Sequence, residues 1–120
     1  MNFGFNNQKE KVEMYSKADA NQKILNELNN FLYIASASTT YKTIPANSAM
    51  ESISISYSLP TGYTGLMVSG WRISGLDDDV RIIGMFVSGS NVIIDFMNDS
   101  NSSKTVYINL LKVLCKRNVY

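Results

Sequence analysis

The residues from Tyr63 to Gly75 place the strongest constraint on how this chain can fold. An apolar run bounded by glycines holds the only tryptophan, and such a run between turn residues predicts a β-strand. Side chains alternate between the two faces of a strand. One face would carry Met67, Trp71 and Ile73, and the other would carry Leu66, Val68 and Gly70. Because both faces are apolar, we expect both to be covered.

Other predicted strands share this property. Those that contain Ile82, Val92 and Val106 are also apolar on both faces, whereas Ile53 to Leu59 alternates apolar residues with serines. Antiparallel strands of a small domain commonly leave one face to solvent. A domain of this size cannot cover the second faces of so many strands by itself. Other copies of the same chain are the simplest cover, so the pattern predicts an oligomer.

Composition excludes several classes of function. The net charge of +1, with scattered lysines and arginines, does not predict nucleic-acid binding. Without histidine, one chain cannot form a Ser-His-Asp triad, a Cys-His pair or the common histidine-based metal sites. Cys115 cannot form an internal disulfide, and its strand pattern predicts a buried hydrophobic role. No apolar run predicts a membrane span or a signal peptide, so we expect a soluble chain.

The segment before residue 41 differs from the rest. Met1 to Tyr15 is polar, which fits either the end of an upstream segment of a longer protein or a short disordered start. Ser16 to Leu32 has a helical pattern, with Ser16 as N-cap and Asp19 in the first turn. Its apolar residues Ile24, Leu28 and Phe31 have coiled-coil spacing. A helix this short needs support, either from its own domain or from copies of itself in a bundle.

A linker of small residues, Ala35 to Thr40, separates this neck-like segment (residues 1–40) from a predicted β domain (residues 41–120). Tyr41 to Ile44 predicts a short strand, and Pro60 to Gly62 predicts a turn. Val80 to Met97 predicts a hairpin with Gly89 at positive φ. The expected pairs are Val87–Val92, Met85–Ile94, Ile83–Phe96, Phe86–Ile93, Gly84–Asp95 and Ile82–Met97. The last strand, Lys104 to Cys115, should carry Val106, Ile108, Leu110 and Leu114 on one face and Tyr107, Leu111, Val113 and Cys115 on the other.

Two polar loops are the candidate ligand site. Strand direction places the turn at Asp77 to Asp79 and the loop at Asn98 to Ser103 at one end of the domain, away from the Ser88 to Asn91 turn. The candidate ligand-binding residues are Asp77, Asp78, Asp79, Asn98, Asp99 and Asn101. Three adjacent acids cannot all point at one calcium ion, so no metal site and no cofactor are predicted. Taken singly, each loop is better explained as a solvated surface loop, and only their convergence at one end favours a ligand site.

Two further residues are conspicuous. Trp71 fits either a core position, which we favour, or a platform on which a sugar stacks. Asp95 is expected on an apolar face opposite Gly84, where its charge needs a partner such as Arg72 or Lys112. We interpret Asp95 as a member of a structural pair or as an interface contact.

Four motifs carry a family resemblance over about two thirds of the chain. They are I-P-A-N-S (44–48), L-P-T-G-Y (59–63), G-W-R-I-S-G (70–75) and V-S-G-S-N-V-I-I (87–94). In these the sequence resembles the C-terminal receptor-binding head domains of tail-fibre and baseplate proteins from phages and prophages of Gram-positive bacteria. The resemblance implies a homotrimer with a helical neck and an antiparallel, jelly-roll-like β-sandwich head. It also implies a virion tail protein, made in the bacterial cytoplasm and acting outside it, that joins upstream tail proteins and binds host-surface glycans.

Three functions follow from these observations. The favoured one is a glycan-binding head of a phage adhesion device. The second is a module that trimerises or caps a fibre without binding a receptor. The third is a depolymerase that uses paired carboxylates. Because no two acids converge on strands in the sequence pattern, we expect a protein without enzymatic activity.

Overall fold

The structure is a computed structural model that describes residues 19–24 and 31–119. It divides into two compact units at the bond between Phe31 and Leu32. In the first unit, residues 19–24 are helical, as the pattern of Ser16 to Leu32 predicts. The predicted helix positions 16–18 and 25–30, Ser16 and Leu28 among them, lie outside the described residues. Phe31 is helical, and Leu32, the predicted last helix residue, is in a strand. Within the described part of the chain, no helix is long and apolar enough to cross a membrane.

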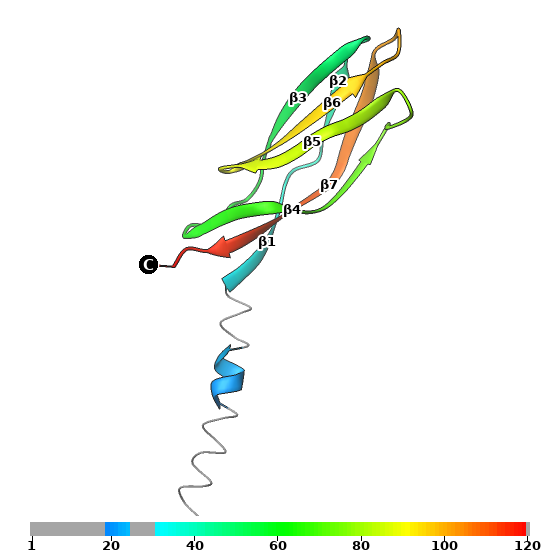
Figure 1. Cartoon of the computed structure of the whole chain (residues 1–120). Coiled ribbons are helices and arrows are strands. Elements are labelled where there is room, and N and C mark those ends of the chain that lie inside the picture. The colour runs from blue at the N-terminus through cyan, green and yellow to red at the C-terminus, as the bar shows by residue number, and fades with distance from the viewer. Residues whose placement is uncertain (1–18, 25–30, 120) are drawn as a thin grey trace, which may run out of the picture. The chain divides into compact units, whose positions relative to one another are not determined.

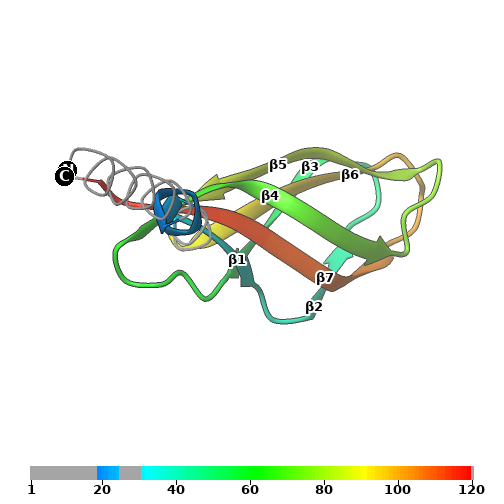
Figure 2. The ribbon, with the colours of Figure 1, turned by 90° about the horizontal axis from the view of Figure 1, so that it is seen from below.

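The second unit consists of antiparallel strands in two sheets (Figure 1; Figure 2). In the four-stranded sheet, β7 pairs with β4 along one edge and with β1 and β2 along the other. In the three-stranded sheet, β6 lies between β3 and β5. The strands are β1 (Leu32–Ser36), β2 (Thr40–Ile44), β3 (Ser48–Ser56), β4 (Tyr63–Ser74), β5 (Val80–Ser88), β6 (Asn91–Asn98) and β7 (Lys104–Arg117). The chain is therefore mainly β, as predicted.

One hydrophobic core joins both sheets. Strand β6 alternates strictly and buries Val92, Ile94 and Phe96. The serines of β3 face away from the core while Ile55 and Tyr57 are buried, which confirms the predicted one-sided strand. Cys115 is buried in this core, as expected, and burial raises the pKa of its thiol.

Bulges change the predicted faces of two long strands. In β7, Asn109 and Leu110 are both exposed, so Leu111, Val113 and Cys115 return to the buried face of Val106 and Ile108. The prediction that Val106 shares its face with Leu110 is therefore wrong. The pairing of β4 with β7 shifts register between Gly65 and Met67 and again between Val68 and Gly70. A bulge adds one residue to one strand and reverses the parity after it.

The bulges also decide the position of Trp71. Val68 and Ile73 pack against the core, whereas Leu66, Met67 and Trp71 are exposed. The predicted faces of this strand are therefore wrong, because Ile73 and Met67 do not share one. The core interpretation of Trp71 is also wrong, since 49% of its surface is exposed.

The hairpin of β5 and β6 follows the prediction over most of its length. The pairs from Ser88–Asn91 to Gly84–Asp95 have the expected register, and Gly89 has a φ of 58°. Beyond Gly84 a bulge at Ile83 sets Ile82 against Phe96, so the two predicted pairs at this end are wrong. Ile82 consequently packs on the core, and Ile83 is exposed.

Strand β1 is not among the predicted strands. Residues Leu32 to Ser36 pair with β7, and Ala35 is fully buried, although this stretch was assigned to the helix end and the linker. The strand-bearing unit thus begins at Leu32, whereas the pattern placed the start of the β domain at residue 41. The five residues of β1 carry little signal of their own, and pairing with β7 decides their conformation.

The side chain of Tyr57 stabilises the end of the domain that contains the β5–β6 turn. Its hydroxyl donates a hydrogen bond of 2.6 Å to the carbonyl oxygen of Gly89. A Cβ at position 65 would lie 1.9 Å from that hydroxyl oxygen, so only glycine fits beside it. Burial raises the pKa of Tyr57.

Candidate functional site

Three connecting segments meet at the opposite end of the domain. They are the turn before β3, the loop between β4 and β5, and the loop between β6 and β7. The backbone N–H of Asp99 donates to the carbonyl oxygen of Asp79 at 2.9 Å, and that of Asn47 donates to the carbonyl oxygen of Ser100 at 3.0 Å. The structure therefore brings together the two polar loops, as strand direction predicts, and adds the turn at Asn47.

Asn98 organises this end from the inside. Its side chain is 1% exposed, and its amide nitrogen donates to the carbonyl oxygens of Ile44 at 3.1 Å and Ser102 at 2.9 Å. Its amide oxygen accepts from the backbone N–H and the hydroxyl of Ser100, at 2.9 and 2.8 Å. Both polar atoms of the amide are engaged, so Asn98 shapes the loop and does not offer these atoms to a ligand.

Asp77 is also committed to its own loop. One carboxylate oxygen accepts from the backbone N–H groups of Asp79 and Val80, each at 2.8 Å. The other oxygen lies 3.6 Å from the Lys104 ammonium nitrogen. The bond from Val80, then the bond from Asp79, and also the Lys104 charge lower the pKa of Asp77. We assign Asp77 to turn stabilisation.

The remaining predicted site residues lie at the surface. Asp99 accepts from the Arg81 guanidinium at 2.7 Å, with both side chains about half exposed. Asp78, Asp79 and Asn101 are exposed. Arg81 is not among the predicted site residues, because only the bulge at Ile83 sets it opposite Met97 and thus close to Asp99.

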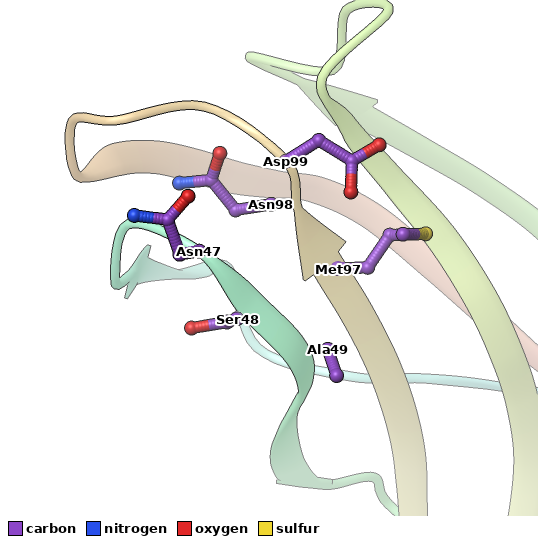
Figure 3. A pocket seen from close by; sticks show the side chains of 6 residues that line it. All are labelled: Asn47, Ser48, Ala49, Met97, Asn98 and Asp99. Carbon is purple, nitrogen blue, oxygen red and sulfur yellow. The ribbon is translucent and has the colours of Figure 1, made fainter.

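A hollow of about 300 Å³ lies between the turn before β3 and the end of β6 (Figure 3). Its lining residues are Asn47, Ser48, Ala49, Met97, Asn98 and Asp99. Two of these, Asn98 and Asp99, belong to the predicted set. The three aspartates of the 77–79 turn and Asn101 do not line it.

Asn47 and Ser48 line the hollow but are not among the predicted site residues. Asn47 has a φ of 53°, a conformation that asparagine adopts more readily than most residues. Its position in the I-P-A-N-S turn was the available signal. The Ser48 hydroxyl donates to the carbonyl oxygen of Pro45 at 2.9 Å, which holds this turn closed. The hollow thus combines an exposed amide and an exposed carboxylate with the apolar surface of Ala49 and Met97.

Such a set of groups can bind hydroxyl compounds. A carboxylate accepts hydrogen bonds, a primary amide both donates and accepts them, and the apolar side chains can contact C–H groups. In the stretches 19–24 and 31–119, no three or more Cys, Asp or Glu side chains are grouped to hold a metal ion.

A second hollow, of about 340 Å³, lies where the edges of β4 and β5 face each other. It contains Trp71 together with Leu66, Met67, Val68, Met85, Phe86 and Val87. Its side chains are apolar apart from the indole N–H of Trp71, so it offers a single donor to orient a sugar. This surface fits a hydrophobic contact better than a glycan.

Comparison of the chain with protein-family models, with curated proteins and with solved structures found no match.

Proposed function

We propose that this chain is the glycan-binding head of a phage or prophage tail fibre or baseplate, which attaches the particle to a host cell surface. The observation that carries this proposal is the hollow beside Asn47 and Asp99, whose walls are fixed by the buried Asn98 network. The resemblance of the turn motifs to such head domains supports the same function. In this proposal the protein is not an enzyme and needs no cofactor.

Binding would rest on a site formed before the ligand arrives. Asn98 holds its loop through four hydrogen bonds, so little conformational entropy is lost when a ligand binds. The Asp99 carboxylate would accept hydrogen bonds from sugar hydroxyls, and the Asn47 amide would donate and accept. Met97 and Ala49 would contact a C–H face of the sugar ring.

The proposal includes the finer architecture. The two sheets form a jelly-roll-like β-sandwich head, three copies associate, and the helical segment continues toward upstream tail proteins. Several weak sites on one particle bind a polymeric glycan more tightly than a single site does. The protein would be made in the bacterial cytoplasm and act on the outside of the virion.

The test is a screen of host-surface glycans with the wild-type chain and with a variant that carries Asn47→Gly and Asp99→Ala. Glycine keeps the positive φ of position 47, so the fold should persist. We expect glycan affinity to fall at least ~10-fold, as loss of more than one hydrogen bond to a ligand implies. Ser90→Ala, in the exposed turn at the opposite end, is the matched control and should bind like wild type.

Undiminished binding by the Asn47→Gly, Asp99→Ala variant would place the site elsewhere.

A second candidate function is an assembly or capping module that binds no receptor. The exposed apolar side chains of the four-stranded sheet favour it. A wild-type chain that forms trimers and binds no glycan in the screen would support this second function instead.

A further inference from the structure

The two sheets carry opposite charge. The strands of the four-stranded sheet contain six basic residues and no acidic one: Lys42, Arg72, Lys104, Lys112, Lys116 and Arg117. The strands of the three-stranded sheet contain two acidic residues, Glu51 and Asp95, and one basic residue, Arg81. Two faces with this difference in charge attract each other when they come from different copies of the chain.

Most of the other charges near these faces are already engaged. Lys42 pairs with Glu51 at 3.1 Å, Lys104 with Asp77 at 3.6 Å, and Arg81 with Asp99 at 2.7 Å. The Lys112 ammonium donates to the Ser36 hydroxyl at 2.6 Å. Among the residues that the structure describes, Asp95 is the one acidic residue of the three-stranded sheet without an ion pair, and Arg72 shares this state in the four-stranded sheet with Lys112, Lys116 and Arg117.

Arg72 and Asp95 cannot meet within one chain. Arg72 lies opposite Leu110 on the outer face of the four-stranded sheet, since its neighbour Ile73 packs on the core. Asp95 lies on the outer face of the three-stranded sheet, between the buried Ile94 and Phe96. The expected internal partner of Asp95, Arg72 or Lys112, is therefore wrong.

The local partner of Asp95 is Ser52, whose hydroxyl donates to the carboxylate at 2.5 Å. The carboxylate also covers Gly84, where a Cβ would lie 2.8 Å from one of its oxygens. A hydroxyl neutralises no charge, so Asp95 remains half-buried with its charge uncompensated.

Both charges are surrounded by apolar side chains. The outer face around Arg72 exposes Ile34, Tyr41, Met67, Tyr107 and Leu110. The face around Asp95 holds Phe86, Ile93 and Met97, with Ile83 at its bulge. Five half-exposed side chains amount to roughly 500 Å² of apolar area, against ~800 Å² per partner in a standard interface. They are enough for the apolar centre of an interface with a polar rim.

We propose that copies of this chain associate head to tail, with the four-stranded face of one copy on the three-stranded face of the next. Arg72 then faces Asp95 of the next copy. The same face placed against itself would bring Arg72 and Lys112 toward their own equivalents, which opposes a two-fold contact. A contact between two different faces forms a closed ring when the rotation between copies is a whole fraction of a turn, and a rotation of one third gives the trimer of the proposed function. This inference rests on the oligomer of the proposed function and names its interface.

Charge exchange tests the pairing. Light scattering at micromolar concentration would measure the mass of the wild-type chain, of Arg72→Glu, of Asp95→Lys, and of the variant with both changes. Each single change places like charges together and should raise the dissociation constant about 100-fold, while the double change should restore association. Asp79→Lys is the matched control, because it changes the net charge as Asp95→Lys does but lies in the loop outside both faces.

Circular dichroism would confirm that each variant is folded. Since Asp95 fits tightly over Gly84, Arg72→Glu and Tyr41→Ser, at two exposed positions, keep the test valid if Asp95→Lys fails to fold. An unchanged oligomer in both of these variants would overturn the inference. The inference would also be overturned if both single variants dissociate and the double variant stays dissociated. A wild-type chain that is a monomer and binds an anionic polymer through Arg72 would overturn it too. Glycan binding is measured separately, so its loss would affect the proposed function and not this interface.

Discussion

The outer faces of β3 and β7 differ in the kind of side chain that they expose. Strand β3 presents Ser52, Ser54 and Ser56 to solvent, whereas β7 presents Tyr107 and Leu110. Both strands bury apolar side chains on their inner faces. The shared inner pattern stabilises one core, so the difference outside concerns what lies beyond the chain. Hydroxyls suit water or the polar rim of an interface, and exposed aromatic rings suit its apolar centre.

The largest effect, on the free energy of unfolding, should come from truncating an apolar side chain of the core. Phe96 is fully buried, and Phe96→Ala should lower the free energy of unfolding by about 3–5 kcal/mol. Phe86→Ala, in the same hairpin but at a position that is 50% exposed, should cost the single chain far less. Denaturant unfolding of both variants measures the contrast. Equal losses would mean that Phe86 belongs to the core.

A smaller effect should appear when exposed aromatic side chains of the four-stranded sheet are replaced by serine, the side chain that β3 exposes. Tyr41 and Tyr107 lie side by side, with ring centroids 6.2 Å apart. Tyr41→Ser with Tyr107→Ser should weaken association about 10-fold or more while monomer stability changes little. Ser90→Ala, in the exposed β5–β6 turn outside both faces, should change neither quantity. Sedimentation measures association, and unchanged association in the double tyrosine variant would contradict the contrast between the faces.

The smallest effect concerns pH, at the loop that links the two sheets. The pKa of Asp77 is lower in the folded chain than in the unfolded one, so the folded chain binds fewer protons than the unfolded chain at acidic pH. Its contribution is present above the ordinary pKa of aspartate, about 4, and is lost as pH falls through the lower folded value. Melting temperatures of Asp77→Asn should therefore depend less on pH below about pH 4 than those of wild type. An Asp77→Asn variant that keeps the full wild-type dependence on pH would contradict this role of Asp77.

The sequence predicts those parts of the fold in which the chain pattern alone decides the outcome. The serine alternation fixes the faces of β3, and the Gly89 turn fixes the hairpin register as far as Gly84. Bulges at Ile83, between Asn109 and Leu110, and near Leu66 break the later predictions. Each bulge depends on the partner strand, which a single-strand pattern does not contain.

The candidate site could be predicted at the level of loops and not of atoms. Strand direction places the loops of Asp77 and Asn98 at one end, and the hydrogen bond from Asp99 to Asp79 confirms it. The burial of Asn98 continues the alternation of Val92, Ile94 and Phe96 in β6, so it follows only when the strand is extended by one residue into the predicted polar loop. Asn47 joins the hollow only because two turns distant in sequence are hydrogen-bonded together.

The central place of β7 has a consequence for the order in which the domain forms during synthesis. In the described sheet, β1, β2 and β4 have β7 as their shared partner, although all three precede it in the chain. The ribosome therefore releases three strands whose pairing edge does not yet exist, while β3, β5 and β6 can already close their own sheet. During that interval the nascent chain exposes Ala35, Ile44 and Ile73 on unpaired strands, which the finished domain covers. Folding of the four-stranded sheet is thus coupled to translation of residues 104–117, and chaperone demand should peak just before they emerge.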